Sequence, residues 1–124
     1  MIDHVSLGSR NYAESVAFYA RALAPLRITL QRDTGKEAAF GRGDDWMFFI
    51  YPAADDTTVT APGMHVAFRA DSRDVVAQVH ADALASRGLD ILTPRMRPDI
   101  SSTYFGAMFH DLDGHRIEVL TRAD

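Results

Sequence analysis

Hydrophobic and polar residues alternate from position 2 to position 8, which is the spacing of a β-strand with one buried face. A helical spacing of large apolar residues follows at Tyr12, Val16, Tyr19 and Leu23. Asn11 and Glu14 have the separation of a capping box, and Pro25 is expected to end the helix. The pattern therefore predicts a strand followed by a helix that begins after Asn11.

Three short strands are predicted after this helix. They cover about residues 27–31, 37–41 and 46–51, and they are separated by turn sequences at Gly35 and at residues 41–45. The first part of the chain thus has the predicted order βαβββ.

The second part of the chain repeats this order. Residues 63–69 have a strand pattern, and residues 72–87 have a helical pattern that Gly88 closes. Strands are then predicted at about 89–93, 103–110 and 115–121. The last two are joined by the turn sequence Asp-Leu-Asp-Gly.

The two parts are related by a weak internal repeat. Residues 2–7 align with residues 63–68, and at the same offset Asn11 meets Ser72, a second candidate N-cap. We therefore predict an α+β fold made of two tandem βαβββ modules within a single domain spanning residues 1–124. Module 1 is expected at about 1–52, a linker at about 53–61, and module 2 at about 62–124.

Composition narrows the functions to be considered. The 124 residues are 47% hydrophobic and 24% charged, as in an ordinary globular protein. A net charge of −4 without a basic stripe disfavours nucleic acid as a partner, and the absence of cysteine excludes thiolate chemistry. The longest aromatic and aliphatic run, 46–51, is too short to cross a membrane. We expect a cytoplasmic protein with no membrane contact.

Strand alternation brings out three polar residues. If the apolar faces of the strands pack on the helices, His4, His65 and Glu118 all point to the other side of the sheet. Two imidazoles and one carboxylate suit a divalent metal that keeps open positions for a substrate. The alternative is that the histidines are hydrogen-bonded structural residues and that Glu118 is a solvated carboxylate.

Four segments of the sequence resemble motifs of the vicinal oxygen chelate superfamily. This superfamily contains glyoxalases, bleomycin-resistance proteins and extradiol dioxygenases. The matching segments are Asp-His-Val-Ser-Leu-Gly at 3–8, Ser-Val-Ala-Phe-Tyr at 15–19, Gly-Met-His-Val-Ala-Phe at 63–68 and Asp-Leu-Asp-Gly-His-Arg-Ile-Glu at 111–118. In the last of these, Leu112 and His115 depart from the family pattern.

The resemblance implies a half-open, eight-stranded, barrel-like sheet with the two helices outside and a metal in its cup. Family metal positions lie on the first, fourth, fifth and eighth strands, and His4, His65 and Glu118 match three of them. The resemblance also implies a homodimer. Whether one chain or two would build each cup is left open.

The residue at the ligand position of the predicted fourth strand distinguishes between members of this superfamily. Aligning residues 44–49 with 113–118 places Phe49 opposite Glu118, where glyoxalase I relatives are expected to carry a ligand. A phenyl ring cannot ligate a metal, so true glyoxalase I chemistry is disfavoured. A set of three ligands is closer to extradiol dioxygenases and fosfomycin-resistance thiol transferases.

Other residues are candidates for the substrate site. Arg97, with Arg95 beside it, is expected to hold a substrate carboxylate or phosphate, and Phe49 an apolar part of the ligand. Tyr104 is expected to contact the substrate or donate a proton, which makes it, with Glu118, a candidate catalytic residue. Solvation of the arginines and packing of the aromatic rings are the alternatives.

The remaining histidines have other predicted roles. His110 and His115, with the nearby aspartates, are a second possible metal site, whereas His80 is expected to be structural.

The leading hypothesis is a metal-dependent enzyme that binds two neighbouring oxygens of a small substrate to a divalent ion. Lyase or isomerase, dioxygenase and thiol-transferase reactions remain open, as do iron(II), manganese, nickel and zinc. The alternative is a protein without catalysis that binds and sequesters an antibiotic-type small molecule.

Overall fold

The chain folds into two βαβββ halves in the order predicted from the sequence. The structure is a computed structural model, and it describes residues 1–123. The first half contains β1 (Val5–Ser9), α1 (Tyr12–Ala22), the 3₁₀ turn η1 (Ala24–Leu26), β2 (Thr29–Asp33), β3 (Ala38–Arg42) and β4 (Asp45–Pro52). The second half contains β5 (His65–Arg69), α2 (Arg73–Ala85), β6 (Leu89–Met96), β7 (Phe105–His110) and β8 (Arg116–Thr121).

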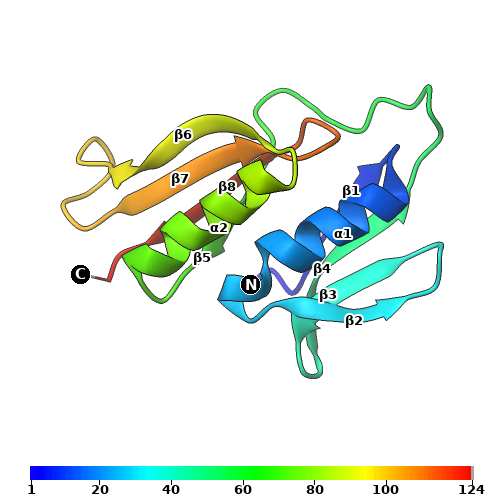
Figure 1. The fold of residues 1–124 in the computed structure, drawn as a ribbon, viewed down its shortest axis with the longest axis horizontal. Helices are drawn as coiled ribbons and strands as arrows, with labels where there is room; N and C mark the ends of the chain where they lie inside the picture. The colour runs from blue at the N-terminus through cyan, green and yellow to red at the C-terminus, as the bar shows by residue number, and fades with distance from the viewer. Residues whose placement is uncertain (124) are drawn as a thin grey trace.

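Each half builds its own four-stranded sheet, in the order β1-β4-β3-β2 and β5-β8-β7-β6 (Figure 1). The pairs β1·β4 and β5·β8 are parallel, and the other neighbours are antiparallel. The predicted α+β fold of two tandem modules is confirmed. Within the described residues the two sheets are not closed into a barrel.

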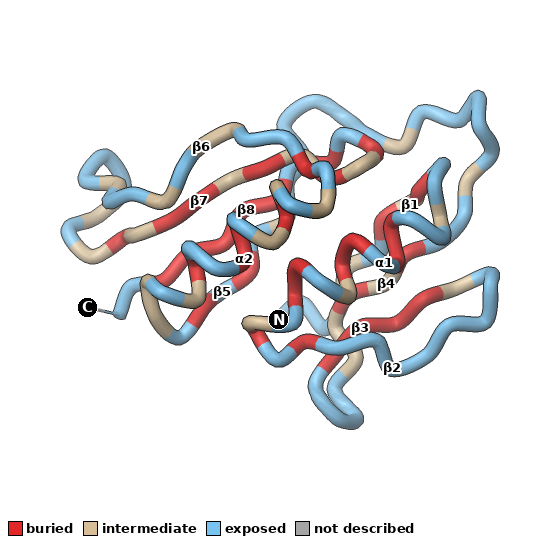
Figure 2. Tube along the Cα trace, viewed as in Figure 1, coloured by how far each residue is buried: buried red, intermediate tan, exposed pale blue. Residues whose placement is uncertain are grey.

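Helices α1 and α2 lie side by side and contact each other (Figure 1). Each sheet buries one face against the helices, so that buried positions recur along β3, β4, β7 and β8 (Figure 2). Neither helix within residues 1–123 has the length and apolar character needed to span a membrane.

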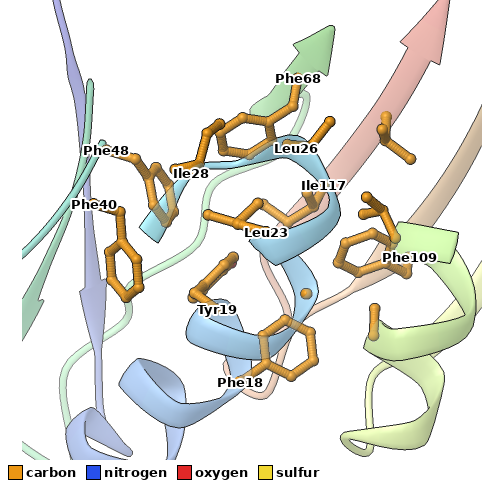
Figure 3. Close-up of a cluster of buried hydrophobic side chains, with 14 of the residues drawn as sticks. Phe18, Tyr19, Leu23, Leu26, Ile28, Phe40, Phe48, Phe68, Phe109 and Ile117 are labelled. Carbon is orange, nitrogen blue, oxygen red and sulfur yellow. The ribbon is translucent and has the colours of Figure 1, made fainter. Parts of the chain in front are cut away.

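One hydrophobic core runs through both halves. Leu23 and Leu26, at the end of α1 and in η1, lie between Phe48 of the first sheet and Phe68 and Ile117 of the second (Figure 3). Phe48 and Phe68 make an edge contact with ring centroids 5.4 Å apart. Because these side chains are almost fully buried, the hydrophobic effect ties the two halves together.

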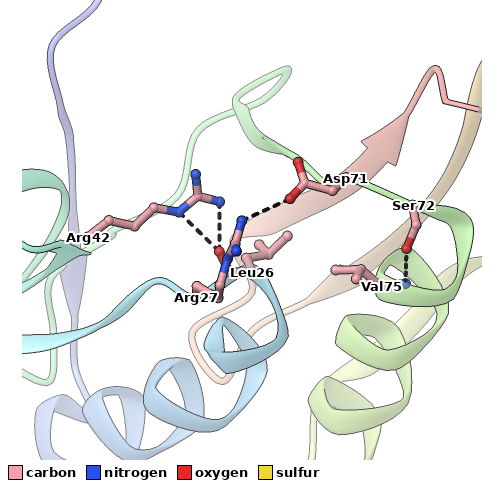
Figure 4. Close-up of polar contacts among 6 residues, drawn as sticks. All are labelled: Leu26, Arg27, Arg42, Asp71, Ser72 and Val75. Carbon is pink, nitrogen blue, oxygen red and sulfur yellow. Dashed lines mark hydrogen bonds and ion pairs between the residues drawn. The ribbon is translucent and has the colours of Figure 1, made fainter.

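Polar contacts surround the same junction (Figure 4). The Arg42 guanidinium donates from Nε and Nη2 to the Leu26 carbonyl, at 3.1 and 2.7 Å, and so holds η1 against β3. Arg27, in the left-handed conformation after η1, reaches across to Asp71 of the second half at 3.0 Å. Both charges of that pair are exposed, so we expect it to add little stability.

The turn between β7 and β8, residues 111–115, holds the start of the first module. The Asp113 carboxylate accepts hydrogen bonds from the Ser9 hydroxyl at 2.5 Å and from the Arg10 amide at 2.8 Å. The capping box predicted at Asn11 and Glu14 is wrong, because the Asn11 side chain makes no cap and instead donates to Asp113 at 3.3 Å. A distant carboxylate outcompetes the local cap.

Two other residues of the same turn also reach the first module. The Tyr19 hydroxyl of α1 donates to the buried Asp111 carboxylate, whose other oxygen accepts from the Asp113 and His115 amides at 2.9 Å each. The His115 ring lies 2.7 Å from the Gly8 carbonyl, which requires Nε2 to carry the proton. The 111–115 turn therefore adds buried polar links between the halves to the exposed Arg27–Asp71 pair.

Candidate functional site

His65 and Glu118 lie side by side on the face of the second sheet that points away from α2. Parallel pairing of β5 with β8 places Ala67 beside Glu118, with His65 one step along the same face. The distance from His65 Nε2 to Glu118 Oε1 is 3.3 Å. Glu118 is buried, whereas the His65 side chain is 43% exposed, so the pair is accessible from the imidazole side.

Tyr104 fixes the other oxygen of Glu118. It precedes β7, its side chain is buried, and its hydroxyl donates to Glu118 Oε2. Burial, followed by the hydrogen bond and the negative charge of Glu118, raises the pKa of Tyr104 to about 12. At neutral pH the phenol therefore stays protonated and acts as a hydrogen-bond donor to the carboxylate.

Two arginines flank Tyr104. The Arg97 amide donates to the Tyr104 carbonyl at 2.7 Å, and the Arg122 guanidinium carbon lies 5.1 Å from the centre of the Tyr104 ring. Both positive charges act to lower the pKa of Tyr104 against the larger opposing effects. Arg122 escaped the sequence analysis, although Arg116, Glu118, Leu120 and Arg122 follow one alternation and so face the same way.

His4 belongs to the other half and precedes β1, rather than lying mid-strand. Its Nδ1 atom is 2.7 Å from the Asp3 carboxylate, and its ring meets the edge of Phe49 at 5.1 Å. The side chain is half exposed. Among residues 1–123 no three histidine, aspartate or glutamate side chains come together as a metal-binding group, so one chain does not unite His4 with His65 and Glu118.

Phe49 occupies the position in the first module that Glu118 occupies in the second. Register places Phe49 beside Ser6, just as Glu118 lies beside Ala67, and Ser6 and Ala67 are equivalent in the internal repeat. The Phe49 ring is partly exposed and stacks on Tyr51 with centroids 6.4 Å apart. The open face of the first sheet is thus aromatic where that of the second is polar.

The remaining histidines have other partners. His115 is bonded to the Gly8 carbonyl, and His110 Nδ1 lies 3.1 Å from the Gly114 carbonyl. Since Asp111 and Asp113 are engaged with the first module, this turn does not form the second metal site considered from the sequence. His80 is buried and pairs with Asp90 at 2.8 Å, as expected of a structural residue.

The fold and the matching sequence define the family. Residues 1–119 match the model of the Glyoxalase/Bleomycin resistance protein/Dioxygenase superfamily. The chain therefore belongs to this superfamily, as its motifs indicate. No curated protein sequence matches the chain.

Solved structures with low sequence identity share the fold. A glyoxalase/bleomycin resistance protein from Albidiferax ferrireducens T118 is 24% identical, with a TM-score of 0.86 and 98% of each chain covered. The fosfomycin resistance protein FosX from Listeria monocytogenes is 19% identical, with a TM-score of 0.72, covering 98% of this chain and 92% of that one. A glyoxalase I mutant from Zea mays is also 19% identical, with a TM-score of 0.74, but only 46% of its chain is covered.

Proposed function

We propose that the protein is a metal-dependent enzyme that acts on a small oxygenated molecule at the face formed by β5 and β8. The observation that carries this proposal is the His65–Glu118 pair, in which a buried, hydrogen-bonded carboxylate lies 3.3 Å from an accessible imidazole. An oxygen and a nitrogen donor at this distance fit a divalent ion of the iron(II), manganese, nickel or zinc type.

The donor set becomes complete when a second copy of the chain takes part. His4 faces solvent on the other half, and α1 and α2 pack together within one chain. In a two-fold homodimer, the first sheet of one protomer would face the second sheet of its partner, and each site would combine His4 from one copy with His65 and Glu118 from the other. The symmetry produces two such sites.

Each residue then has a distinct task. A bound ion would act as a Lewis acid and stabilise negative charge that develops on the substrate oxygens. Tyr104 is a positioning residue for Glu118, because its hydroxyl occupies the oxygen that His65 does not face. Tyr104 also lies beside the pair, so a substrate bound there would come within its reach, and we propose it as a catalytic contact as well.

Phe49 supports an apolar part of the site. Its ring, stacked on Tyr51 and touched by His4, gives the first sheet a flat surface that excludes water from one side of a ligand. The same surface favours a second candidate function, in which the protein binds and sequesters a small molecule without catalysis. Metal dependence separates the two functions.

The test is the metal content of protein purified anaerobically and incubated with iron(II), manganese, nickel or zinc. Mass spectrometry should find about one ion per chain in the unmodified protein, because a symmetric dimer has one site per chain. His65→Ala and Glu118→Ala should release it, since each removes a donor. His110→Ala is the matched control, because it removes an imidazole that pairs with a backbone carbonyl instead.

Retention of the ion in Glu118→Ala would overturn the proposed site. If no ion binds to any of these proteins, the enzyme proposal fails and ligand sequestration becomes the function to pursue.

A further inference from the structure

Arginine side chains gather on the same face of the second sheet as Glu118. The whole chain carries a net charge of −4, so this positively charged face has the opposite sign to the molecule as a whole. The arginines on and beside this face are Arg69, Arg95, Arg97, Arg116 and Arg122.

Strand register places them there. Arg116 lies beside His65, two residues from Glu118, and Arg69 lies beside Leu120 on the same alternation. Arg95 of β6 pairs with Gly106 of β7, which in turn pairs with Leu120. Since residues that are register partners share a face, these guanidinium groups lie on the Glu118 face, with Arg116 on the His65 side of Glu118 and Arg69 and Arg95 on the other side.

Two carboxylates act on the positive charge of this face: Glu118, whose charge reaches Arg97, and Asp99. Within residues 1–123 the only ion pair among these arginines joins Arg97 to Asp99, with Nε–Oδ1 and Nη2–Oδ2 distances of 3.0 and 2.8 Å. Asp99 is an exposed carboxylate, so an anion that supplies the same two acceptor oxygens can exchange with it on Arg97.

We infer that this face binds the anionic group of the substrate, a carboxylate or a phosphorus oxyanion, with Arg97 and Arg122 as its two direct contacts. This inference rests on the proposed function, because it assigns a substrate class to the same site. Arg97 and Arg122 are chosen from the five because both lie against Tyr104, which touches Glu118. The anion would therefore bind next to the proposed metal donors.

The geometry of Arg97 already fits such a ligand. Its guanidinium holds the Asp99 carboxylate through two parallel hydrogen bonds, which is the arrangement that arginine makes with carboxylate and phosphate ligands. Its backbone is held by the Tyr104 carbonyl, and its side chain is only 26% exposed. The guanidinium thus already holds a carboxylate in the two-bond arrangement that a substrate anion would take.

The experiment measures anion binding to the metal-free full-length protein by nuclear magnetic resonance. The probes are inorganic phosphate, methylphosphonate and benzoate, and benzamide is the uncharged counterpart of benzoate. We expect the three anions, but not benzamide, to shift the Nε–H signals of Arg97 and Arg122. Tighter binding of phosphate and methylphosphonate than of benzoate would identify the ligand group as a phosphorus oxyanion. The reverse order would identify it as a carboxylate.

Arg97→Gln and Arg122→Gln should each weaken anion binding by about tenfold or more, since each removes a charged hydrogen-bond donor. Arg21→Gln is the matched control, because it removes the same charge from an exposed position at the end of α1. Equal binding by all three variants would indicate an adventitious ion only and overturn the inference. Metal retention by the two site variants, measured separately, shows whether the proposed metal site still stands.

Discussion

At the scale of single residues, the buried carboxylates of the 111–115 turn have the clearest consequences. Burial raises the pKa of Asp111, although the Tyr19 hydroxyl, the charge of His115 and the backbone amides act in the opposite direction. The ionised form therefore pays a desolvation cost that its hydrogen bonds do not fully offset.

Asp111→Ala and Asp111→Asn should differ in stability. The alanine variant leaves the Tyr19 hydroxyl and two amides without their acceptor, and we expect it to lose about 3 kcal/mol in the free energy of unfolding at pH 7. The asparagine variant keeps an acceptor oxygen for the amides and should lose less. Urea denaturation of the three proteins measures this, and equal losses would contradict the assigned hydrogen bonds.

The difference in stability between the unmodified protein and Asp111→Asn should depend on pH. Because the pKa of Asp111 is higher in the folded than in the unfolded protein, its protonation favours the folded state. Its stabilising contribution is fully present below the unfolded pKa and is lost as the pH rises through the folded value. The unmodified protein should therefore gain stability relative to Asp111→Asn as the pH falls into the acidic range, as urea titrations at several pH values would show.

Tyr104→Phe tests the positioning of Glu118. The substitution removes the hydrogen bond to a buried carboxylate and should lower the free energy of unfolding by about 1.5–3 kcal/mol. Between pH 10 and about 12 the unmodified protein should also lose stability more steeply than the variant, because the folded-state pKa of Tyr104 is raised to about 12 and unfolding lets the phenol ionise. Parallel stability curves over this range would contradict the contact.

At the scale of elements, the shared core makes the two modules depend on each other. Leu23 is fully buried between them, and Leu23→Ala should cost about 2–5 kcal/mol. We expect the fluorescence of Trp46 in the first module and amide signals from α2 in the second to report one unfolding transition with a common midpoint. Loss of one module while the other stays folded would contradict a single core.

The sequence predicted the elements well where their signal is local. Alternation and helical spacing placed all eight strands and both helices in order, because these patterns reflect which face of each element is buried. The predicted cap of α1 was wrong because it depends on a contact that is distant in the sequence. Asn11 has the correct local spacing, but the carboxylate that engages it comes from residue 113, and no local pattern contains that contact.

In the candidate site, too, the features that depend on local pattern were predicted and those that depend on module packing were not. The positions of His65 and Glu118 on one face, and the equivalence of Phe49 and Glu118, follow from register that alternation anticipates. The separation of His4 from the other two depends on how the modules pack, which alternation does not encode. Arg122 was accessible to the same reasoning as Glu118, but it lies beyond the end of β8 as the pattern defines it.

At the scale of the whole molecule, the separation of His4 from its proposed partners predicts complementation between chains. Protein carrying His4→Ala and protein carrying Glu118→Ala should each fail to hold an ion tightly. Refolding them together in equal amounts should restore metal to about a quarter of the sites, because half of the dimers are mixed and each has one intact site.

The oligomeric state checks this prediction directly. Light scattering after size-exclusion chromatography should give the mass of two chains for the unmodified protein and for both variants. A monomer, or a mixture of variants that recovers no metal, would contradict a site built from two copies.

The link through the 111–115 turn also bears on how the chain could be cut and rejoined. The equivalent turn of the first module, around Asp44, is exposed, and among the described residues its side chains make no comparable hydrogen bonds to the second module. The two halves therefore differ in how they are held together. A fragment ending in the linker would leave the hydroxyls of Ser9 and Ser15 and the Gly8 carbonyl without their partners from the second module, Asp113 and His115. A chain in which a new linker joins the two modules in the opposite order would contain every residue that makes these bonds, and so offers a route to exchanging the order of the modules.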